Sequence, residues 1–538
     1  MRSRQMTATV VPQREVSTPQ QPAVRYALQA AAASLVVLIL ATLVLPFGYA
    51  AFDDREYVDA ALRWTEEGPH AAANHWAARL PYVLTLAAGF RLLGAQETVL
   101  VILHSLLFGL ILVVAWSLGR QAFGARTAFF SVLVALGTLM VARLPTRYGI
   151  EPMEMALTGL TCVLVLGAWD ALLQRRMMVL FLAGIIGGLA LSVRQTAIAA
   201  PVSLALLLLF ADRTQAVPAR LASVVALALG YVLPTIGEMA FNQIVAGDPL
   251  HRLSVDLRHV EIPSAHLAGH TYHGGTGLFF NWDLAARWQV PAPIPTHWTL
   301  TPLVRLFLSP WTMLLPALGL LGAWFVLRNP RVQSSGAAMR LALLALMVLG
   351  LQYVLNTFVL VIAPNVRYYW LAVLLLCPLA AHALLRLLPR PGLAFVAWAA
   401  VFALPSLAVA LVQPVPAAMV PLLERFAMRE GDLFATDELH ALARFRLAED
   451  PNLAERVQHG TVPVGALVAA TRSAPPENGF AARCPDGSAQ WQVIESTTPS
   501  SLPWRVFEAL RIAPLLPDSV ARILRQDEQR VTLLRRRC

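Results

Sequence analysis

Residues 97–118 read ETVLVILHSLLFGLILVVAWSL, an apolar run whose one formal charge, Glu97, lies at its start. A helix that crosses a bilayer needs about 20 apolar residues, so this run predicts a transmembrane helix. A short turn with Arg120 and Arg126 follows, and a second apolar run begins there. Basic residues in short connections mark the cytoplasmic side of a membrane. The stretch therefore predicts a helical hairpin with an inner turn.

The rest of the chain repeats this pattern. Of 538 residues, 57% are hydrophobic and 14% are charged, and the mean hydropathy is +0.60, whereas about a quarter of the residues of a soluble domain are charged. This composition excludes a single soluble domain, a disordered chain and a small disulfide scaffold. It predicts an all-α polytopic membrane protein with about eleven transmembrane helices. The predicted spans are 27–49, 97–118, 126–145, 152–172, 177–193, 196–211, 219–245, 308–327, 340–363, 366–388 and 391–413.

The first of these runs, 27–49, has a second interpretation as a cleaved signal peptide. It is longer than the ~7–15-residue core of such peptides, which favours an uncleaved first span. Residues 1–25 are polar and aperiodic, and we predict a disordered cytoplasmic tail.

Arginine sets the predicted orientation. All 42 basic residues are arginine, against 32 acidic residues, for a net charge of +10. Most lie in short connections between apolar runs. This placement marks the cytoplasmic side of the membrane and does not point to a nucleic-acid partner. With the N-terminus inside, every inner connection is basic and the tail beyond 413 lies outside. These inner residues are Arg120, Arg126, Arg175, Arg176, Arg213, Arg220, Arg328, Arg331, Arg340, Arg386 and Arg390.

Three large segments then face outward: loops 50–96 and 246–307, which belong to a transmembrane domain at 26–413, and a polar region at 414–538. Short apolar alternations and helical periods in the last predict a small extracytoplasmic α/β domain. Cys484 and Cys538 lie in it, and the sequence alone leaves their pairing open. The predicted strands are 433–436, 462–471 and 491–494, and the predicted helices are 437–448, 503–511 and 519–525.

The first outer loop starts with Phe52-Asp53-Asp54-Arg55-Glu56-Tyr57. Carboxylates at a membrane boundary are costly and often functional. Three further motifs follow in order along the chain. They are Arg79-Leu80-Pro81, Phe90-Arg91-Leu92-Leu93-Gly94 and, near a late span, Arg367-Tyr368.

This order of motifs resembles the GT-C glycosyltransferases that use polyprenyl-phosphate sugars, and most of all glycosyltransferase family 39, which includes protein O-mannosyltransferases and the aminoarabinose transferases of lipid A. The resemblance covers roughly residues 27–400. Relatives often carry Lys where this chain has Arg79, and the region after 414 matches no subfamily. The resemblance implies a GT-C-like fold in a bacterial inner membrane. It also implies inverting transfer from a polyprenyl-phosphate sugar to a glycan, lipid or protein acceptor on the extracytoplasmic face.

Such a reaction needs a base for the acceptor hydroxyl, because the phosphate leaving group is already an anion. Asp53 is the first candidate for this base and Asp54 the second; an interfacial carboxylate that merely ends the helix or pairs with Arg55 is the alternative. Glu151 and Glu154 lie on the same predicted side, and in relatives an acidic residue here lies at the active site. Together with Asp53, one of them would form a carboxylate cluster able to hold a divalent metal or to orient the acceptor. Acids that oppose a helix dipole are the alternative.

The donor phosphate needs positive charge, and a guanidinium forks onto phosphate oxygens. Arg79, Arg194 and Arg367 are predicted on the outer side and are the candidates, with lipid-directed snorkelling as the alternative. The resemblance adds Tyr57 and Tyr368 as substrate-binding residues.

The second outer loop carries His266, His270 and His273 at helical spacing. This spacing suits Zn²⁺, but nearby glycines and the lack of flanking Cys or carboxylates favour a loop that contacts acceptor or headgroups. We therefore assign no cofactor and leave a divalent metal open.

Two other functions compete with the enzyme hypothesis. A flippase of lipid-linked sugars would carry charges within its spans and some repeat symmetry, and neither is evident. A binding module at 414–538 on a membrane anchor would not need eleven spans.

Overall fold

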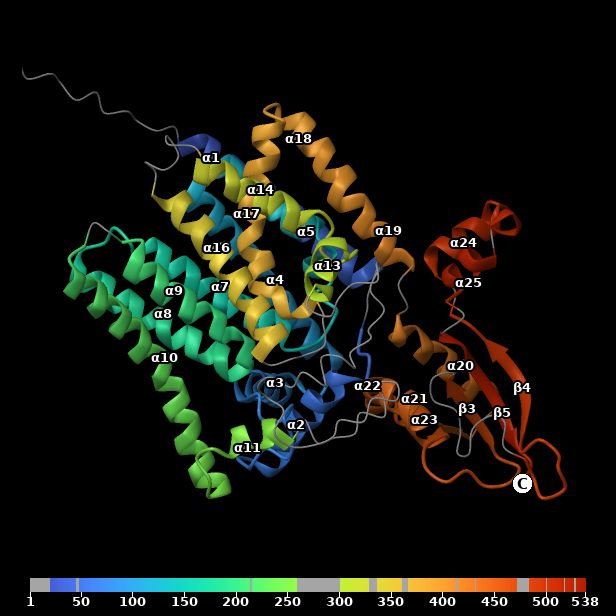
Figure 1. Ribbon diagram of the computed structural model, residues 1–538. Helices are drawn as coiled ribbons and strands as arrows, with labels where there is room; N and C mark the ends of the chain where they lie inside the picture. Colours follow the sequence, from blue (N-terminus) through green and yellow to red (C-terminus); the bar gives the residue numbers. More distant parts are fainter. Residues whose placement is uncertain are drawn as a thin grey trace, which may run out of the picture.

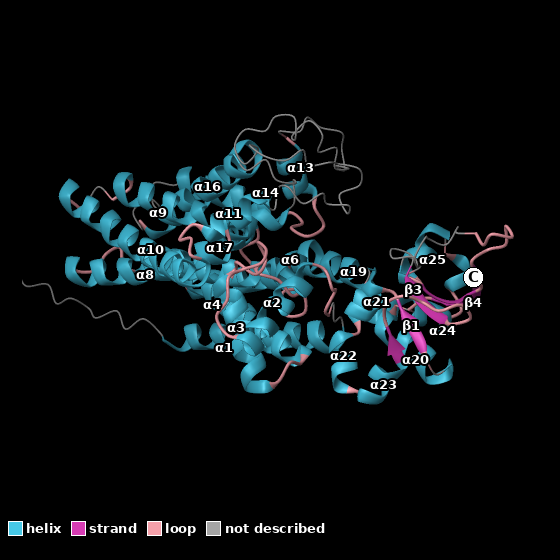
Figure 2. Cartoon of the chain, turned by 90° about the horizontal axis from the view of Figure 1, so that it is seen from below, coloured by secondary structure: helices cyan, strands magenta, loops and turns pink. Residues whose placement is uncertain are grey.

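A computed structural model describes the chain at residues 20–44, 48–212, 215–258, 300–328, 336–359, 366–412, 415–430, 432–471, 483–499, 501–516, 518–526 and 529–538. The helices between residues 20 and 412 form a bundle. A small domain of helices and strands follows at one side of it (Figure 1). Figure 2 shows the strands gathered in that domain alone. The predicted fold class, a polytopic helical protein with a small C-terminal α/β domain, is confirmed.

Each of the predicted apolar runs is helical over most of its length. Among the described residues, seven helices are long and apolar enough to cross a membrane, so the chain is a multi-pass membrane protein; the number of eleven spans stays a prediction. The helices of the bundle are α1 Gln20–Ile39 with η1 Leu40–Val44, α4 Glu97–Phe123, α5 Ala125–Gly137, α6 Leu139–Ala142, α7 Glu151–Gly167, α8 Leu173–Val193, η2 Gln195–Ile198, α9 Ala199–Phe210, α10 Val217–Ala246, α14 Leu315–Arg328, α16 Ala337–Val354 with η4 Leu355–Val359, η5 Val366–Tyr369, α17 Trp370–Leu387, and α18 Pro391–Trp398, η6 Ala399–Ala403 and α19 Leu404–Val412.

Several helix boundaries differ from the predicted ones, and three of the differences change how a predicted run is built. The first helix begins earlier than the predicted run 27–49, at Gln20. The run 308–327 is interrupted, because α13 (Thr301–Leu308) ends before Pro310 and α14 begins only at Leu315. Proline lacks the N–H that a continuous helix would need. The run 126–145 breaks at Thr138, between α5 and α6.

The outer faces of the bundle are apolar. On α10, four large side chains are about half exposed in the isolated chain: Leu221, Leu229, Leu233 and Ile236. A helix that faces water rarely exposes so much apolar surface, whereas a helix that faces lipid does. The inner side of α10 packs on α8 through glycines. A Cβ at Gly184 would lie 2.2 Å from the backbone oxygen of Leu227, and a Cβ at Gly230 2.1 Å from that of Phe181, so only glycine permits this close approach.

Three shorter helices lie at one end of the bundle. They are α2 (Asp53–Glu67), α3 (Leu80–Leu93) and α11 (His251–Arg258), and Figure 1 shows them together at the same end as α22. The first outer loop is therefore helical over much of its length. The candidate His266, His270 and His273 site lies outside the described residues, as does most of the predicted tail at 1–25.

The C-terminal domain holds a five-stranded sheet in the order β2-β1-β3-β5-β4. Strand β1 pairs in parallel with β2 and β3, whereas β3, β5 and β4 pair antiparallel. The predicted strands and helices of this region are present; strands β2 and β5 and helices α20 and α23 are additional. Cys484 and Cys538 form a disulfide. The elements are η7 Pro416–Met419, α20 Val420–Glu430, β1 Leu433–Ala435, α21 Asp437–Leu442, α22 Arg444–Glu449, α23 Pro451–Arg456, β2 Val457–Gln458, β3 Leu467–Thr471, β4 Trp491–Thr497, α24 Leu502–Ala509, η8 Ala513–Leu515, α25 Asp518–Leu524 and β5 Val531–Arg536.

This domain contacts the bundle end next to α2. Phe445 of α22 meets the edge of the Tyr49 ring, with ring centres 5.0 Å apart. Arg444, one residue earlier, forms an ion pair with Asp59 of α2. Helix α2 therefore lies between the membrane helices and the C-terminal domain, and it carries the first candidate residues of the site.

Candidate active site

The start of α2 is fixed by the second of its two adjacent aspartates. Asp54 is 5% exposed, and its carboxylate accepts backbone hydrogen bonds from Ala50 at 2.7 Å, Phe52 at 2.7 Å and Arg55 at 3.2 Å. Burial raises the pKa of Asp54 to about 6, although these N–H donors favour the charged form. All of its hydrogen bonds go to the turn in which it lies. These contacts favour a structural role for Asp54 over its role as the second candidate for the general base.

Asp53 is placed differently. Its side chain is 50% exposed, and Oδ2 lies 3.3 Å from Nη1 of Arg367, a residue 314 positions later in the chain. Oδ1 accepts a hydrogen bond from Nε1 of Trp76 at 3.3 Å. The carboxylate is therefore oriented by two partners and still open on one side.

Two glutamates at the start of α7 share an arginine. Nη1 of Arg194, at the C-terminal end of α8, lies 3.6 Å from Oε1 of Glu151 and 3.5 Å from Oε2 of Glu154. Glu154 also accepts a hydrogen bond from Oγ1 of Thr196 at 2.6 Å. Because two carboxylates face the one guanidinium of Arg194, neither glutamate forms an exclusive ion pair with it.

Arg367 joins these groups to Asp53. Its Nη1 lies 4.0 Å from Oε1 of Glu151, and its Nη2 donates to the hydroxyl of Tyr368 at 3.3 Å. The Tyr368 ring centre lies 4.6 Å from the guanidinium carbon of Arg194 and 5.3 Å from that of Arg367, within the range of cation–π attraction. We call the connected set the Asp53 cluster: Asp53, Glu151, Glu154, Arg194, Arg367 and Tyr368.

Arg79, the third candidate for the phosphate, belongs to a neighbouring network. Its Nη2 lies 3.2 Å from Oδ1 of Asp256 on α11, and both side chains are less than 10% exposed. Asp256 also accepts from the amide of Gln195 and lies 3.6 Å from Nε of Arg252. The guanidinium of Arg79 thus has a buried carboxylate partner that the sequence analysis did not identify.

Tyr57 lies in the core between the two networks. It is 5% exposed and meets the edge of the Tyr82 ring, with centres 5.2 Å apart. Burial, and then the negative charge of Glu151, raise the pKa of Tyr57 above its ordinary value, so the phenol stays neutral. Its described contacts are those of a packing residue next to the site.

Three contributors were missed from the sequence: Trp76, Thr196 and Asp256. Trp76 follows a polar stretch without periodicity, and Asp256 lies in the segment predicted as the second outer loop, where no pattern singles out one acid. Thr196 follows Arg194 by two residues, and this adjacency is the only available signal. Among the described residues, no three His, Cys, Asp or Glu side chains are grouped so that they could hold a metal ion; the carboxylates of the Asp53 cluster contact guanidinium groups instead.

This arrangement suits an anionic ligand whose chemistry also needs a base. Two arginines converge, Arg194 from the C-terminal end of α8 and Arg367 from η5, and three carboxylates flank them. An incoming phosphate can displace carboxylate partners from the guanidinium groups, and the half-exposed Asp53 can then accept a proton.

Part of the chain matches a known family. Residues 80–237 match the model of the family described as dolichyl-phosphate-mannose-protein mannosyltransferase. The matched segment contains Glu151, Glu154 and Arg194, whereas Asp53 and Arg367 lie outside it. This match confirms the resemblance to glycosyltransferases that use polyprenyl-phosphate sugars. No curated protein sequence matches the chain.

The solved structures to which the chain is similar include the following two. ArnT from Cupriavidus metallidurans, bound to undecaprenyl phosphate, is 17% identical, with 84% of this chain and 94% of that chain covered and a TM-score of 0.48. The archaeal oligosaccharyltransferase AglB from Archaeoglobus fulgidus, in complex with an inhibitory peptide and a dolichol-phosphate, is 12% identical, with 95% of this chain and 88% of that chain covered and a TM-score of 0.46.

Proposed function

We propose that the chain is a membrane glycosyltransferase that moves a pentosyl or hexosyl unit from a polyprenyl-phosphate donor to an acceptor hydroxyl. The observation that carries this proposal is the Asp53–Arg367 contact at 3.3 Å, which joins a half-exposed carboxylate to one of two converging arginines. The family match over residues 80–237 supports the same reaction class. The acceptor is a glycan, a lipid or a protein.

The proposed location is a bacterial inner membrane, with the N-terminus in the cytoplasm. The transmembrane domain at 26–413 would then present the Asp53 cluster on the extracytoplasmic side, together with the domain at 414–538. The run of basic inner connections supports this orientation. It also puts the cluster at the depth where the phosphate of a polyprenyl lipid would lie.

In the proposed mechanism, Arg194 and Arg367 bind the donor phosphate. Both are permanently charged, and both can donate two N–H bonds to phosphate oxygens. They would stabilise the negative charge that grows on the leaving phosphate as the bond from the anomeric carbon to the phosphate oxygen breaks. Polyprenyl phosphate leaves with the electron pair of that bond and needs no proton.

Asp53 is the proposed general base. The acceptor hydroxyl donates its proton to Asp53 while its oxygen forms the new bond to the anomeric carbon, opposite the departing phosphate. One displacement inverts the anomeric centre and needs one carboxylate as base. Positive charge develops on the sugar in the transition state. Because Glu151 and Glu154 lie beside Arg194, their carboxylates would lie near a sugar whose phosphate the arginines hold, and would stabilise that positive charge.

The test is sugar transfer by protein reconstituted in vesicles, with a radiolabelled polyprenyl-phosphate sugar and an envelope extract as acceptor. Loss of a general base costs about 10²–10⁴-fold in rate, so Asp53→Asn should lower transfer by at least about 100-fold with donor binding retained. The matched control is Asp170→Asn, which removes a carboxylate that is 84% exposed and paired with Arg340. Full turnover in Asp53→Asn would contradict the assignment. Labelled lipid that changes leaflet without release of polyprenyl phosphate would indicate a flippase.

A further inference from the structure

A cavity with a partly charged lining lies between α2 and the C-terminal domain, apart from the Asp53 cluster. It has a volume of about 460 Å³ and is lined by charged and imidazole side chains from four segments, together with the apolar Ala441, Leu447 and Ala454. Arg55 comes from α2, Asp437 and His440 from α21, Arg444 from α22, and His459 follows β2. Residues two apart on a helix point to different faces, so Arg55 faces away from the cluster that holds Asp53.

The two arginines of this cavity share one carboxylate, each at a different oxygen. Asp59 forms an ion pair with Arg444 and lies 3.6 Å from Nε of Arg55. Within the described part of the chain, Nε of Arg55 and Nη1 of Arg444 are buried N–H groups that make no hydrogen bond; the Asp59 oxygen 3.6 Å from Nε of Arg55 forms an ion pair with it but lies beyond hydrogen-bond distance. Buried donors without an acceptor are rare and costly. Both would be satisfied by a ligand that brings anionic oxygen atoms into the cavity.

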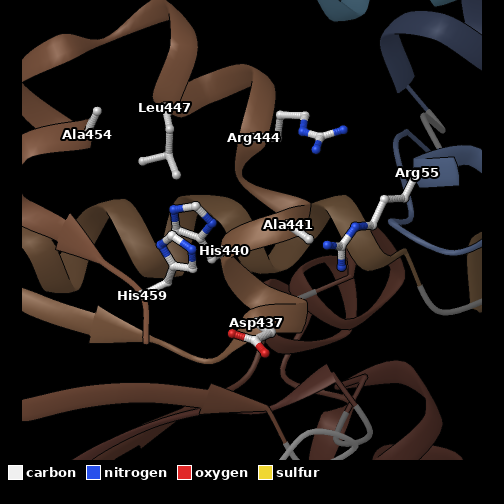
Figure 3. A pocket seen from close by; sticks show the side chains of 8 residues that line it. All are labelled: Arg55, Asp437, His440, Ala441, Arg444, Leu447, Ala454 and His459. Carbon is white, nitrogen blue, oxygen red and sulfur yellow. The ribbon is translucent and has the colours of Figure 1, made fainter. Parts of the chain in front are cut away.

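The two histidines form the opposite wall. The rings of His440 and His459 are stacked, with centres 4.3 Å apart and planes 19° from parallel, and Figure 3 shows them face to face in the cavity. Burial, and then the charge of His459, lower the pKa of His440, which Asp437 raises and Arg444 and Arg55 lower. Asp437 and Asp59 balance the two arginines, so protonation of a histidine gives the cavity a net positive charge.

We propose that this cavity binds a phosphate monoester carried by a saccharide. A phosphate would accept hydrogen bonds from both guanidinium groups and from an imidazole N–H. A phosphate group alone is far smaller than the cavity, whose volume falls in the range of about 300–1,000 Å³ of small-molecule sites. The remaining space and the flat histidine pair suit a sugar ring. This site goes beyond the proposed transfer reaction and does not depend on it.

Calorimetric titration of the full-length protein in neutral-lipid nanodiscs tests the proposal. Glucose 6-phosphate should bind at least about tenfold more tightly than glucose and than inorganic phosphate. Arg55→Gln, and separately the double variant His440→Gln with His459→Gln, should each weaken glucose 6-phosphate binding by about tenfold or more. The control Arg505→Gln removes the same charge from α24, which contributes no residue to the cavity, and should bind as the unaltered protein does.

A second measurement separates charge from shape. Glucose 6-sulfate keeps a constant charge over the range tested, so its binding should tighten severalfold from pH 7.5 to pH 5.5, and the double histidine variant should abolish this change. Equal binding by Arg55→Gln and Arg505→Gln, or no difference between glucose and its 6-phosphate, would overturn the proposal. Binding of a short-chain phosphatidic acid that Arg55→Gln weakens, together with no binding of glucose 6-phosphate, would overturn the saccharide assignment and indicate a lipid headgroup.

Discussion

Helix α8 carries a buried arginine near each end, and the two are paired in opposite ways. Arg176 lies 2.7 Å from Asp212, and the two side chains are 1% and 0% exposed. Arg194, at the other end, faces Glu151 and Glu154 at 3.6 and 3.5 Å, and these contacts continue to Arg367 and the half-exposed Asp53. The helix has 21 residues, or about 30 Å, which is close to the thickness of a hydrocarbon core.

The comparison shows that burial of a charge does not by itself mark a functional site. At Arg176, one guanidinium meets one carboxylate, donates to the Trp169 carbonyl at 3.2 Å and is closed to solvent. At Arg194, charges are shared among several partners, and one member of the set is open. A closed pair can only stabilise the fold, whereas an open, shared set can exchange a partner for a ligand. The predictions below test this difference.

The largest expected effect is on stability at the closed end. Asp212→Asn leaves the buried Arg176 without its counter-charge, which typically costs about 3–5 kcal/mol, so the apparent melting temperature in detergent should fall by several degrees. Replacement of both partners, Arg176→Met with Asp212→Leu, should recover most of this loss. Asp170→Asn, in an exposed pair, should change stability by less than about 1 kcal/mol. An unchanged melting temperature in Asp212→Asn would break the comparison.

The next effect is on binding at the open end. Arg367→Gln should weaken binding of a polyprenyl-phosphate sugar by about 10–100-fold, because a hydrogen bond to a charged group contributes about 1.5–3 kcal/mol. Stability should change little, since its side chain is 33% exposed. Arg386→Gln, near the other end of the same candidate span Val366–Leu387, is the matched control and should bind the donor normally. Equal donor affinity in both variants would contradict the assignment of Arg367.

The smallest effect separates two adjacent residues. Asp54 is closed and Asp53 is open, and the pKa of Asp54 is raised from 3.8 to about 6 by burial. Between these values the folded chain holds one proton more than the unfolded chain, so this carboxyl makes stability fall as pH rises, by about 1 kcal/mol per pH unit. The free energy of unfolding, measured by chemical unfolding at pH 4.5, 5.5 and 6.5, should depend less on pH in Asp54→Asn, by the amount that corresponds to about one bound proton. An identical slope in both proteins would count against the buried carboxyl.

Much of the helical architecture follows from the sequence, because apolar runs of span length have few alternatives in a chain with 14% charged residues. For Asp53 and Arg367, the sequence predicted only that both lie on the same side of the membrane, and not that they are in contact. Their 3.3 Å contact depends on how α2 and α17 pack, and periodicity does not encode packing. The loop 50–96 was predicted as a connection, although α2 and α3 occupy much of it, since its apolar stretch is too short to span a bilayer.

Partners of buried charges were the hardest features to predict. Arg176 was interpreted as an inner-loop residue that sets orientation, yet it is fully buried against Asp212. Arg79 was expected to be free for phosphate, yet Asp256, 177 positions away, faces it at 3.2 Å. Strand β5 was missed because its apolar part is short and does not alternate, since the adjacent Leu533 and Leu534 are both buried, and because arginines follow directly. In each case the partner is distant in sequence and carries no local signal.

The central claim is that the Asp53 cluster, at the Arg194 end of α8, holds the phosphate of a polyprenyl lipid. Electron cryo-microscopy of the protein in nanodiscs with a bound polyprenyl phosphate tests it most directly. We predict phosphate density in contact with the guanidinium groups of Arg194 and Arg367, with Asp53 beside it and open to the solvent. Phosphate density at the Arg176 end, or an Asp53 side chain that faces acyl chains with no lipid phosphate nearby, would contradict the claim.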